Sequence, residues 1–185
     1  MKDAVIVSAA RTPIGKAYRG AFNDLEAPSL SSHAITAAVA RAGVDPGEID
    51  DCIFGAALQQ GTQGGNLGRQ VAMAAGLPVS VSGMSIDRQC SSGLMTIATA
   101  AKQIIVDGSP VILAGGCESI SLAQTEHMNM HRYVDPMAMA HAPNIHMPML
   151  DTAEVVAKRY NISRDAQDEY ALQSQQRTAA AQEAG

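Results

Sequence analysis

Short apolar runs alternate with helix-periodic segments along the first part of the chain. Four runs rich in β-branched or small residues have the length and composition of buried strands. They lie at residues 4–9, 51–58, 83–87 and 110–116. Segments of helical periodicity separate them, so the pattern predicts βαβ crossovers and a largely parallel sheet covered by helices. The predicted fold class is therefore α/β.

The helices between these runs have recognisable start and stop signals. The first is predicted from a Ser29 cap to about Ala42, where Gly43 provides a stop. A second follows a glycine-rich loop, over residues 66–75. The third begins just after Cys90 and runs to about Val106. Because it is apolar nearly all round, this third helix is predicted to be buried.

The pattern changes after the fourth run. Residues 120–150 hold six of the ten methionines and four of the five histidines, with no sustained helical or strand period. A long irregular stretch in a compact domain is typical of a binding loop or lid. Helical periodicity resumes at 151–160, and Ser163 caps a last, largely polar helix with Asp165 in its first turn. We expect a core domain over residues 1–119 and an incomplete loop domain with its following helices over 120–185.

Composition narrows the class of protein. The 185 residues are 46% hydrophobic but only 3% aromatic, so the chain is globular with an aliphatic core. A net charge of −5 argues against nucleic-acid binding. No apolar run is long enough for a bilayer, and the N-terminus lacks the features of a signal peptide. We therefore expect a cytoplasmic protein, with Cys52, Cys90 and Cys117 as thiols rather than disulfides.

The stretch SIDRQCSSGL places Cys90 at the start of the third predicted helix. Unpaired N–H groups and the positive end of the helix dipole favour a thiolate there, and the same N–H groups can face a developing oxyanion. Acyl transfer through a thioester on the protein sulfur suits such a site. A free cysteine is also commonly a small core hydrophobe, and its placement alone leaves both interpretations open.

Five segments, in order along the chain, resemble motifs of the thiolase family. They are AVIVSAARTPIGK, GTQGGNLGRQVAMAAGLP, SIDRQCSSGLMTI, ILAGGCESIS and PMLDTAEVVAKRYNISRDAQDEYALQSQQ. Together they span almost the whole chain, so the resemblance is more specific than any single motif. It implies that Cys90 is the catalytic, acyl-accepting nucleophile.

The resemblance also implies a fold and a reaction. Thiolases consist of two similar βαβαβαββ halves, and Cys90 would open the central helix of the first half. The implied activity is that of an acyl-CoA C-acetyltransferase in fatty acid metabolism. It cleaves 3-ketoacyl-CoA, or runs the reverse condensation, through an acyl-cysteine. Coenzyme A is a substrate, no cofactor is held permanently, and a homodimer or tetramer is expected.

The sequence departs from the family in length. Thiolases are about twice as long, and their second half supplies a Gly-His-Pro histidine and a second catalytic cysteine in a Cys-x-Gly context. Neither motif occurs in these 185 residues, so the isolated chain is predicted to be inactive. Two alternatives remain open: a ketoacyl-synthase-type condensing enzyme and a non-catalytic N-terminal fragment. The segments GGCESIS and TAEVVAKRYNISRDAQDEYAL favour a thiolase.

The methionine-rich region is a candidate substrate contact. By resemblance, Met149 lies at the position of the family's Met-Gly pair, and Pro148 before it favours a degradative enzyme. His146 lies close by, and a small register shift would restore the His-before-Met pattern of biosynthetic thiolases, so both interpretations stay open. The flexible thioethers in this region could form an adaptable acyl pocket, or fill gaps where aromatic residues are scarce. We assign Met149 as substrate-binding.

Other chemistry-bearing residues are given other roles. His127 and His131 have i, i+4 spacing, but no further ligands complete a metal set, and no metal site is predicted. The glycine-rich loop lacks the Gly-Lys-Ser/Thr ending of a phosphate-binding loop. By resemblance, Asn66 and Arg69 lie at a dimer interface near the partner's active site. Glu118 is expected to hydrogen-bond backbone near the active site rather than to catalyse.

Overall fold

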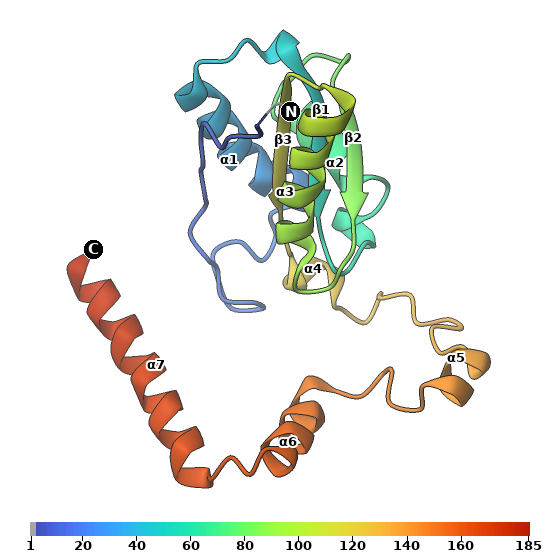
Figure 1. The fold of residues 1–185 in the computed structure, drawn as a ribbon, viewed down its shortest axis with the longest axis vertical. Coiled ribbons are helices and arrows are strands. Elements are labelled where there is room, and N and C mark those ends of the chain that lie inside the picture. Colours follow the sequence, from blue (N-terminus) through green and yellow to red (C-terminus); the bar gives the residue numbers. More distant parts are fainter. Residues whose placement is uncertain (1–2) are drawn as a thin grey trace. The chain divides into compact units, whose positions relative to one another are not determined.

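The computed structural model describes residues 3–185, which form two compact units. The first ends at Asn129 and the second spans Met130–Gly185. The first contains the sheet and the helices that cover it, and the second contains helices and loops (Figure 1). The predicted domain boundary after residue 119 stays a prediction.

A parallel three-stranded sheet forms the centre of the first unit. Its strands are β1 (Ile49–Gly55), β2 (Ser82–Ile86) and β3 (Val111–Gly116), in the order β2-β1-β3. Cys52, in the middle of β1, pairs with Gly83 on one side and Leu113 on the other. The predicted parallel α/β arrangement is confirmed. Because all three strands run the same way, their carboxyl ends meet at one edge.

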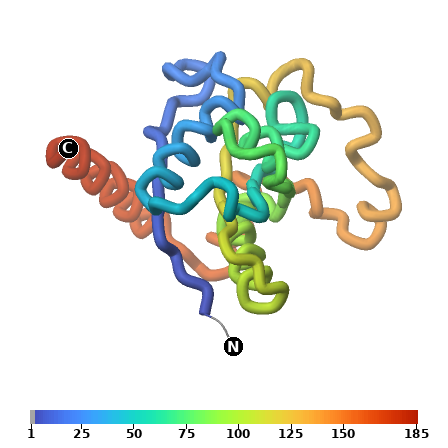
Figure 2. Tube along the Cα trace, turned by 90° about the horizontal axis from the view of Figure 1, so that it is seen from above, coloured from blue at the N-terminus to red at the C-terminus, as the bar shows by residue number. Residues whose placement is uncertain are grey.

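Helices cover both faces of the sheet. α1 (Ala27–Ala42) and α2 (Leu67–Ala74) pack on one face, and α3 (Ser92–Lys102) packs on the other (Figures 1 and 2). The core lies between the first two helices and β1, whose alternate residues Cys52 and Phe54 point into it, and Ala56, just beyond the strand, also belongs to it. The other core members are aliphatic, as the composition predicts: Ala27, Ile35, Ile49, Leu67, Val71, Ala72, Leu77 and Val81.

Local signals set most helix boundaries. Gly43 ends α1 in the left-handed conformation with φ 65°, as expected. α1 begins two residues before the predicted Ser29 cap, because Pro28 fits the first turn of the helix. Asn66 caps α2 by accepting a hydrogen bond from the Arg69 backbone N–H. Short helical turns, Pro46–Glu48 and Gly61–Gln63, precede β1 and α2 respectively.

The prediction of a strand at residues 4–9 is wrong. No strand is assigned to this segment, and Val5, Ile6 and Val7 are 71%, 77% and 66% exposed. A strand needs a pairing partner, and no segment among residues 3–185 pairs with this one; β3 pairs only with β1. The β-branched composition alone is therefore insufficient to place it in the sheet.

The prediction that α3 is buried on nearly all sides is also wrong. Its buried residues are the small Ser92, Thr96 and Ala100, which face the sheet. Leu94 is 72% exposed and Ile97 is 43% exposed. Only one side of the helix has a sheet against it among residues 3–185. α3 continues into a π-helical turn (Gln103–Asp107) that ends at Gly108.

The irregular stretch after β3 contains two short helices, α4 (Ile120–Ala123) in the first unit and α5 (Pro136–His141) in the second. The second unit continues with α6 (Met149–Arg159) and α7 (Arg164–Ala184). Ser163 caps α7 as expected, since its side chain accepts a hydrogen bond from the Ala166 N–H. Every residue of α7 is exposed.

Candidate active site

Cys90 lies at the carboxyl edge of the sheet. The chain leaves β2 at Ile86, makes a tight turn over residues 87–90, and enters α3 with Ser91 as the N-cap. The Cys90 side chain is exposed. The sequence therefore placed the thiol correctly, at the start of a helix that follows a strand.

Hydrogen bonds fix the turn that carries Cys90. The Ser92 hydroxyl donates to the Gln89 carbonyl at 2.6 Å and accepts from the Arg88 N–H at 2.9 Å. Gln89 has a positive φ of 49°, and its N–H donates to the Asp87 carboxylate at 2.7 Å. Because each of these groups has a partner inside the turn, hydrogen bonds of the neighbouring residues fix the position of Cys90. Its own side chain is exposed and does not need to pack.

Glycines at the strand ends let the first turn of α3 approach the sheet. A β-carbon on Gly55, at the end of β1, would lie 2.7 Å from the Ser92 carbonyl carbon. A β-carbon on Gly116, at the end of β3, would lie 3.5 Å from the Gly93 α-carbon. The buried Thr96 hydroxyl lies 3.1 Å from the Gly115 carbonyl oxygen, to which it donates. The first turn of α3 therefore contacts the backbone at the ends of β1 and β3 directly.

The start of α3 lies at the positive end of the helix dipole. Ser91 makes no capping hydrogen bond with its side chain, so no side chain at the N-cap competes for the first N–H groups of the helix. These groups and the helix dipole favour negative charge nearby. An exposed thiol at this position is placed as a nucleophile would be when its attack on a carbonyl forms a tetrahedral intermediate that carries an oxyanion.

The other two thiols are unsuited to this chemistry. Burial, with a smaller contribution from Asp51, raises the pKa of Cys52 to about 12. Burial also raises the pKa of Cys117; the neighbouring Ser31 hydroxyl partly offsets this rise, and the Glu118 charge adds to it. Both thiols therefore stay protonated near neutral pH, and a thiol is a poor nucleophile.

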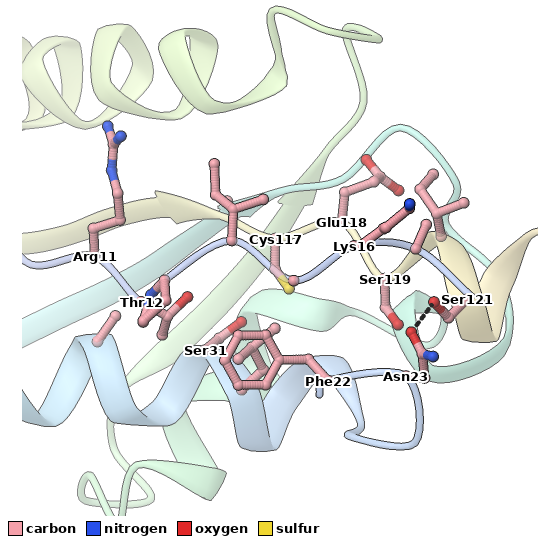
Figure 3. Close-up of a pocket in the computed structure, with 18 of the residues that line it drawn as sticks. Arg11, Thr12, Lys16, Phe22, Asn23, Ser31, Cys117, Glu118, Ser119 and Ser121 are labelled. Carbon is pink, nitrogen blue, oxygen red and sulfur yellow. Dashed lines mark hydrogen bonds between the residues drawn. The ribbon is translucent and has the colours of Figure 1, made fainter. Parts of the chain in front are cut away.

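A cavity of about 440 Å³ lies elsewhere, between the N-terminal loop, α1 and the segment that follows β3. Figure 3 shows Cys117 and Ser31 in its wall, with Arg11 and Lys16 on the N-terminal loop. At one end, the Ser121 hydroxyl donates to Asn23 at 2.9 Å (Figure 3). Cys90 does not line this cavity. We therefore base the candidate active site on the chemistry of the turn and not on the presence of this hollow.

Glu118 hydrogen-bonds to backbone, as expected. Its carboxylate accepts from the Ala57 N–H at 2.8 Å and from the Leu58 N–H at 3.2 Å. It also accepts from the side-chain amide of Gln63 at 2.6 Å. Gln63 is fully buried, and no sequence motif predicts a role for it. One buried glutamine in a glycine-rich loop carries no periodic or motif signal that would have revealed it.

Asn66 and Arg69 have partners within the chain. The Asn66 amide donates to the Gly83 carbonyl at 2.8 Å. The Arg69 guanidinium donates to the carbonyls of Val79, at 3.0 Å, and Val81. Both side chains therefore hold the segment that leads into β2. Their predicted position near a partner's active site stays a prediction.

Comparison with known proteins identifies the family. Residues 4–185 match the family model described as the N-terminal domain of thiolase. The chain belongs to the thiolase family. The family predicted from the five sequence motifs is thus confirmed.

Individual thiolases match the chain over roughly half their own length. A 3-ketoacyl-CoA thiolase of Bacillus subtilis is 42% identical over 182 residues, covering 98% of this chain and 46% of that protein. An acetyl-CoA acetyltransferase of Cupriavidus necator is 41% identical over 197 residues, covering 100% of this chain and 49% of that protein. The crystal structure of the Bacillus anthracis acetyl-CoA acetyltransferase has a TM-score of 0.84 and 35% identity, covering 100% of this chain and 49% of that one. The thiolase fold class is confirmed, and the chain corresponds to the N-terminal half of these relatives.

The remaining candidate residues are largely exposed. Met149 begins α6 in the second unit and is 72% exposed, so its substrate-binding role stays a prediction. His127 lies 3.8 Å from Glu126, and both side chains are 87% exposed. Among residues 3–185, no group of three or more His, Cys, Asp or Glu side chains is arranged to hold a metal ion.

A search of the helices in the described part of the chain finds none that is both long and apolar enough to span a membrane.

Proposed function

We propose that Cys90 is the acyl-accepting nucleophile of an acyl-CoA C-acetyltransferase. The single observation that carries this proposal is the exposed Cys90 thiol at the uncapped start of α3, seated on the glycine ends of β1 and β3. The thiolase names of the relatives support the same reaction class. They also favour a thiolase over the ketoacyl-synthase alternative.

The proposed reaction has two steps. In the first, the Cys90 thiolate attacks the keto carbon of a 3-ketoacyl-CoA, and the bond between that carbon and the next breaks. The electron pair of the broken bond leaves on acetyl-CoA, whose carbon then takes a proton, while the shortened acyl group stays on sulfur. In the second, the thiol of a second CoA gives up its proton and attacks the thioester, which releases acyl-CoA and restores the Cys90 thiolate.

The chain supplies only part of this machinery. The positive end of the α3 helix dipole lies where it can favour negative charge close to Cys90. The proton transfers need positioned acids and bases, which in thiolases belong to the second half of the protein. We therefore propose that the 185 residues alone show no turnover. The cytoplasmic location, the role in fatty acid metabolism, and assembly as a homodimer or tetramer belong to the same proposal.

The nucleophile is tested by acylation. This chain, fused to the second half of the Bacillus subtilis relative, is incubated with acetyl-CoA, and peptides are mapped by mass spectrometry for an added acetyl group. We expect acetylation at Cys90, none in Cys90→Ala, and no change in the matched variant Cys117→Ala. Acetylation of the Cys90→Ala variant at another cysteine would overturn the assignment.

Turnover is tested by adding the missing half. A fusion of this chain to the second half of the Bacillus subtilis relative and the chain alone are each given acetoacetyl-CoA and CoA. Loss of the enolate absorbance of acetoacetyl-CoA reports cleavage. We expect cleavage by the fusion only, because loss of one acid or base typically slows such reactions by about 10²–10⁴-fold. Robust cleavage by the chain alone would show that its own residues, such as His127, act as bases.

A further inference from the structure

We propose that Glu118 is a positioning residue for Cys90, and that Gln63 holds it in place. The carboxylate does not reach the nucleophile directly. It acts by joining the segments that follow β1 and β3, on which the first turn of α3 rests. This inference rests on the proposed function for its chemical meaning, while its structural content stands on hydrogen bonds.

The first step is the contact between the two segments. The Glu118 carboxylate accepts from the N–H groups of Ala57 and Leu58, both just beyond β1. The Cys117 N–H donates to the Gly55 carbonyl at 3.0 Å. The strand ends are therefore joined from both directions. Hydrogen bonds to an ionised carboxylate are roughly twice as strong as those between neutral groups.

The second step is the support that Gln63 gives to Glu118. The Gln63 amide nitrogen donates to the Glu118 carboxylate at 2.6 Å and to the Leu58 carbonyl at 2.8 Å. Its amide oxygen accepts from the Ser119 N–H. Gln63 is 0% exposed, so any of these bonds that is lost leaves a polar group without a partner. A fully satisfied buried amide fixes the Glu118 side chain beside its two backbone donors.

The third step leads from the clamp to the nucleophile turn. The Ala56 N–H donates to the Ile86 carbonyl at 3.1 Å. Ala56 directly precedes the residue that Glu118 holds, and Ile86 is the last residue of β2 before the turn to Cys90. Gly55, which precedes Ala56, lies against Ser92 in the first turn of α3. Movement of the segment after β1 would therefore disturb both ends of the turn.

The side-chain directions agree with this role. Figure 3 shows the Cys117 thiol and the Glu118 carboxylate leaving the chain in opposite directions. Both residues line the cavity, and the Glu118 carboxylate also accepts from the Ala57 N–H in the loop after β1. The Glu118 side chain thus bonds the segment that contacts the nucleophile turn.

Hydrogen exchange tests the positioning. Glu118→Gln keeps the size of the side chain but places an amide where the carboxylate meets three N–H donors. We expect amide exchange in the segment 86–93 to become about tenfold faster or more, through local opening. The reporters are the hydrogen-bonded N–H groups of Arg88, Gln89, Ser91 and Ser92. Glu126→Gln, at a nearby exposed carboxylate, is the matched control and should change nothing there.

A second variant tests the support from Gln63 while the Glu118 carboxylate stays in place. Gln63→Met is close in volume, leaves the Glu118 charge in place, and removes the supporting amide. It should accelerate exchange in the same segment by a smaller factor. Unchanged exchange at 86–93 in both variants, with faster exchange confined to 56–63 and 117–119, would overturn the proposal.

Acylation separates this inference from the proposed function. If Cys90 is acetylated by acetyl-CoA, Glu118→Gln should slow that step about tenfold. Alkylation of the exposed Cys90 by iodoacetamide should change less than about twofold, because it needs no oriented carbonyl. A merely structural effect would instead expose Cys52 and Cys117 to the reagent, and that result would overturn the positioning role. If Cys90 is not acetylated in a fusion of this chain to the second half of the Bacillus subtilis relative, the proposed function fails, and the exchange result still decides the role of Glu118.

Discussion

Gly55 and Ser92 are in backbone contact: a β-carbon on the glycine would lie 2.7 Å from the serine carbonyl carbon. No side chain larger than hydrogen fits between the end of β1 and the first turn of α3. The approach brings the buried Ser92 hydroxyl to the turn that carries Cys90, where it bonds to Arg88 and Gln89. The position of the nucleophile therefore depends on a residue that has no side chain to contribute.

This contact predicts a strong effect of Gly55→Ala. The added methyl group would force the first turn of α3 away from the sheet, and overpacking of this kind costs roughly 1–3 kcal/mol or more. Denaturant unfolding should show that loss. Gly93→Ala, in the same turn, is the control, because an added β-carbon there would meet nothing within 4 Å. It should change stability by less than about 1 kcal/mol. Equal effects of the two substitutions would contradict the contact.

Limited alkylation should label Cys90 before the other two thiols. Cys90 is exposed, whereas burial raises the pKa of both Cys52 and Cys117. With limiting iodoacetamide at about pH 7.5, we expect labelling of Cys90 to be at least about tenfold faster. Mass mapping of the three cysteine peptides measures the ratio. Faster labelling of Cys52 or Cys117 would show that the order is wrong.

Cys52 should make the chain less stable as pH rises. In the folded chain its pKa is raised from the ordinary 9.0 to about 12, so only the unfolded chain loses the thiol proton between these values. Stability from this group is complete below pH 9 and is lost as pH rises toward 12, with a slope of at most about 1.4 kcal/mol per pH unit.

Cys52→Ala isolates this contribution. The substitution should lower stability at about pH 7.5 by roughly 1 kcal/mol, because it removes buried volume. Between about pH 9 and 10.5, however, its free energy of unfolding should fall less steeply than that of the unsubstituted chain. Urea unfolding at each pH gives both slopes. Parallel slopes would show that Cys52 ionises alike in the folded and unfolded states.

The outer face of α3 should cause self-association. Leu94 and Ile97 are exposed there, and apolar patches of this kind drive association. We expect the 185-residue chain to be oligomeric or poorly soluble, and Leu94→Lys to reduce the mass seen by light scattering. Leu172→Lys, at an exposed leucine of α7, is the matched control and should have a smaller effect. A monodisperse, monomeric unsubstituted chain would contradict this expectation.

Features that depend on neighbours in sequence were predictable. Gly43 ends α1, Asn66 starts α2 and Ser163 caps α7, because capping uses groups within one turn of the helix. The same is true of Cys90, whose position follows from the strand before it and the helix after it. The resemblance to thiolase motifs then predicted its chemical role, which placement alone left open and which stays a prediction.

Features that depend on distant segments were not predictable in this way. Residues 4–9 have the composition of a strand but no pairing partner among residues 3–185. The exposed face of α3 carries the large apolar residues Leu94 and Ile97, so its apolar composition led to the wrong prediction that the whole helix is buried. The contact between Gln63 and Glu118 joins residues far apart in sequence, and nothing local to either one indicates it.

The central position of β1 has a consequence for the order of folding. β1 pairs on one side with β2 and on the other with β3, both of which come later in the chain. During synthesis the strand that will lie in the middle is thus made first, and one of its edges stays open until Val111–Gly116 has left the ribosome. Strands far apart in sequence pair slowly, and the unpaired edge of an apolar strand can associate with other chains. The interval between synthesis of β1 and β3 is therefore the period in which a chaperone would protect this chain most.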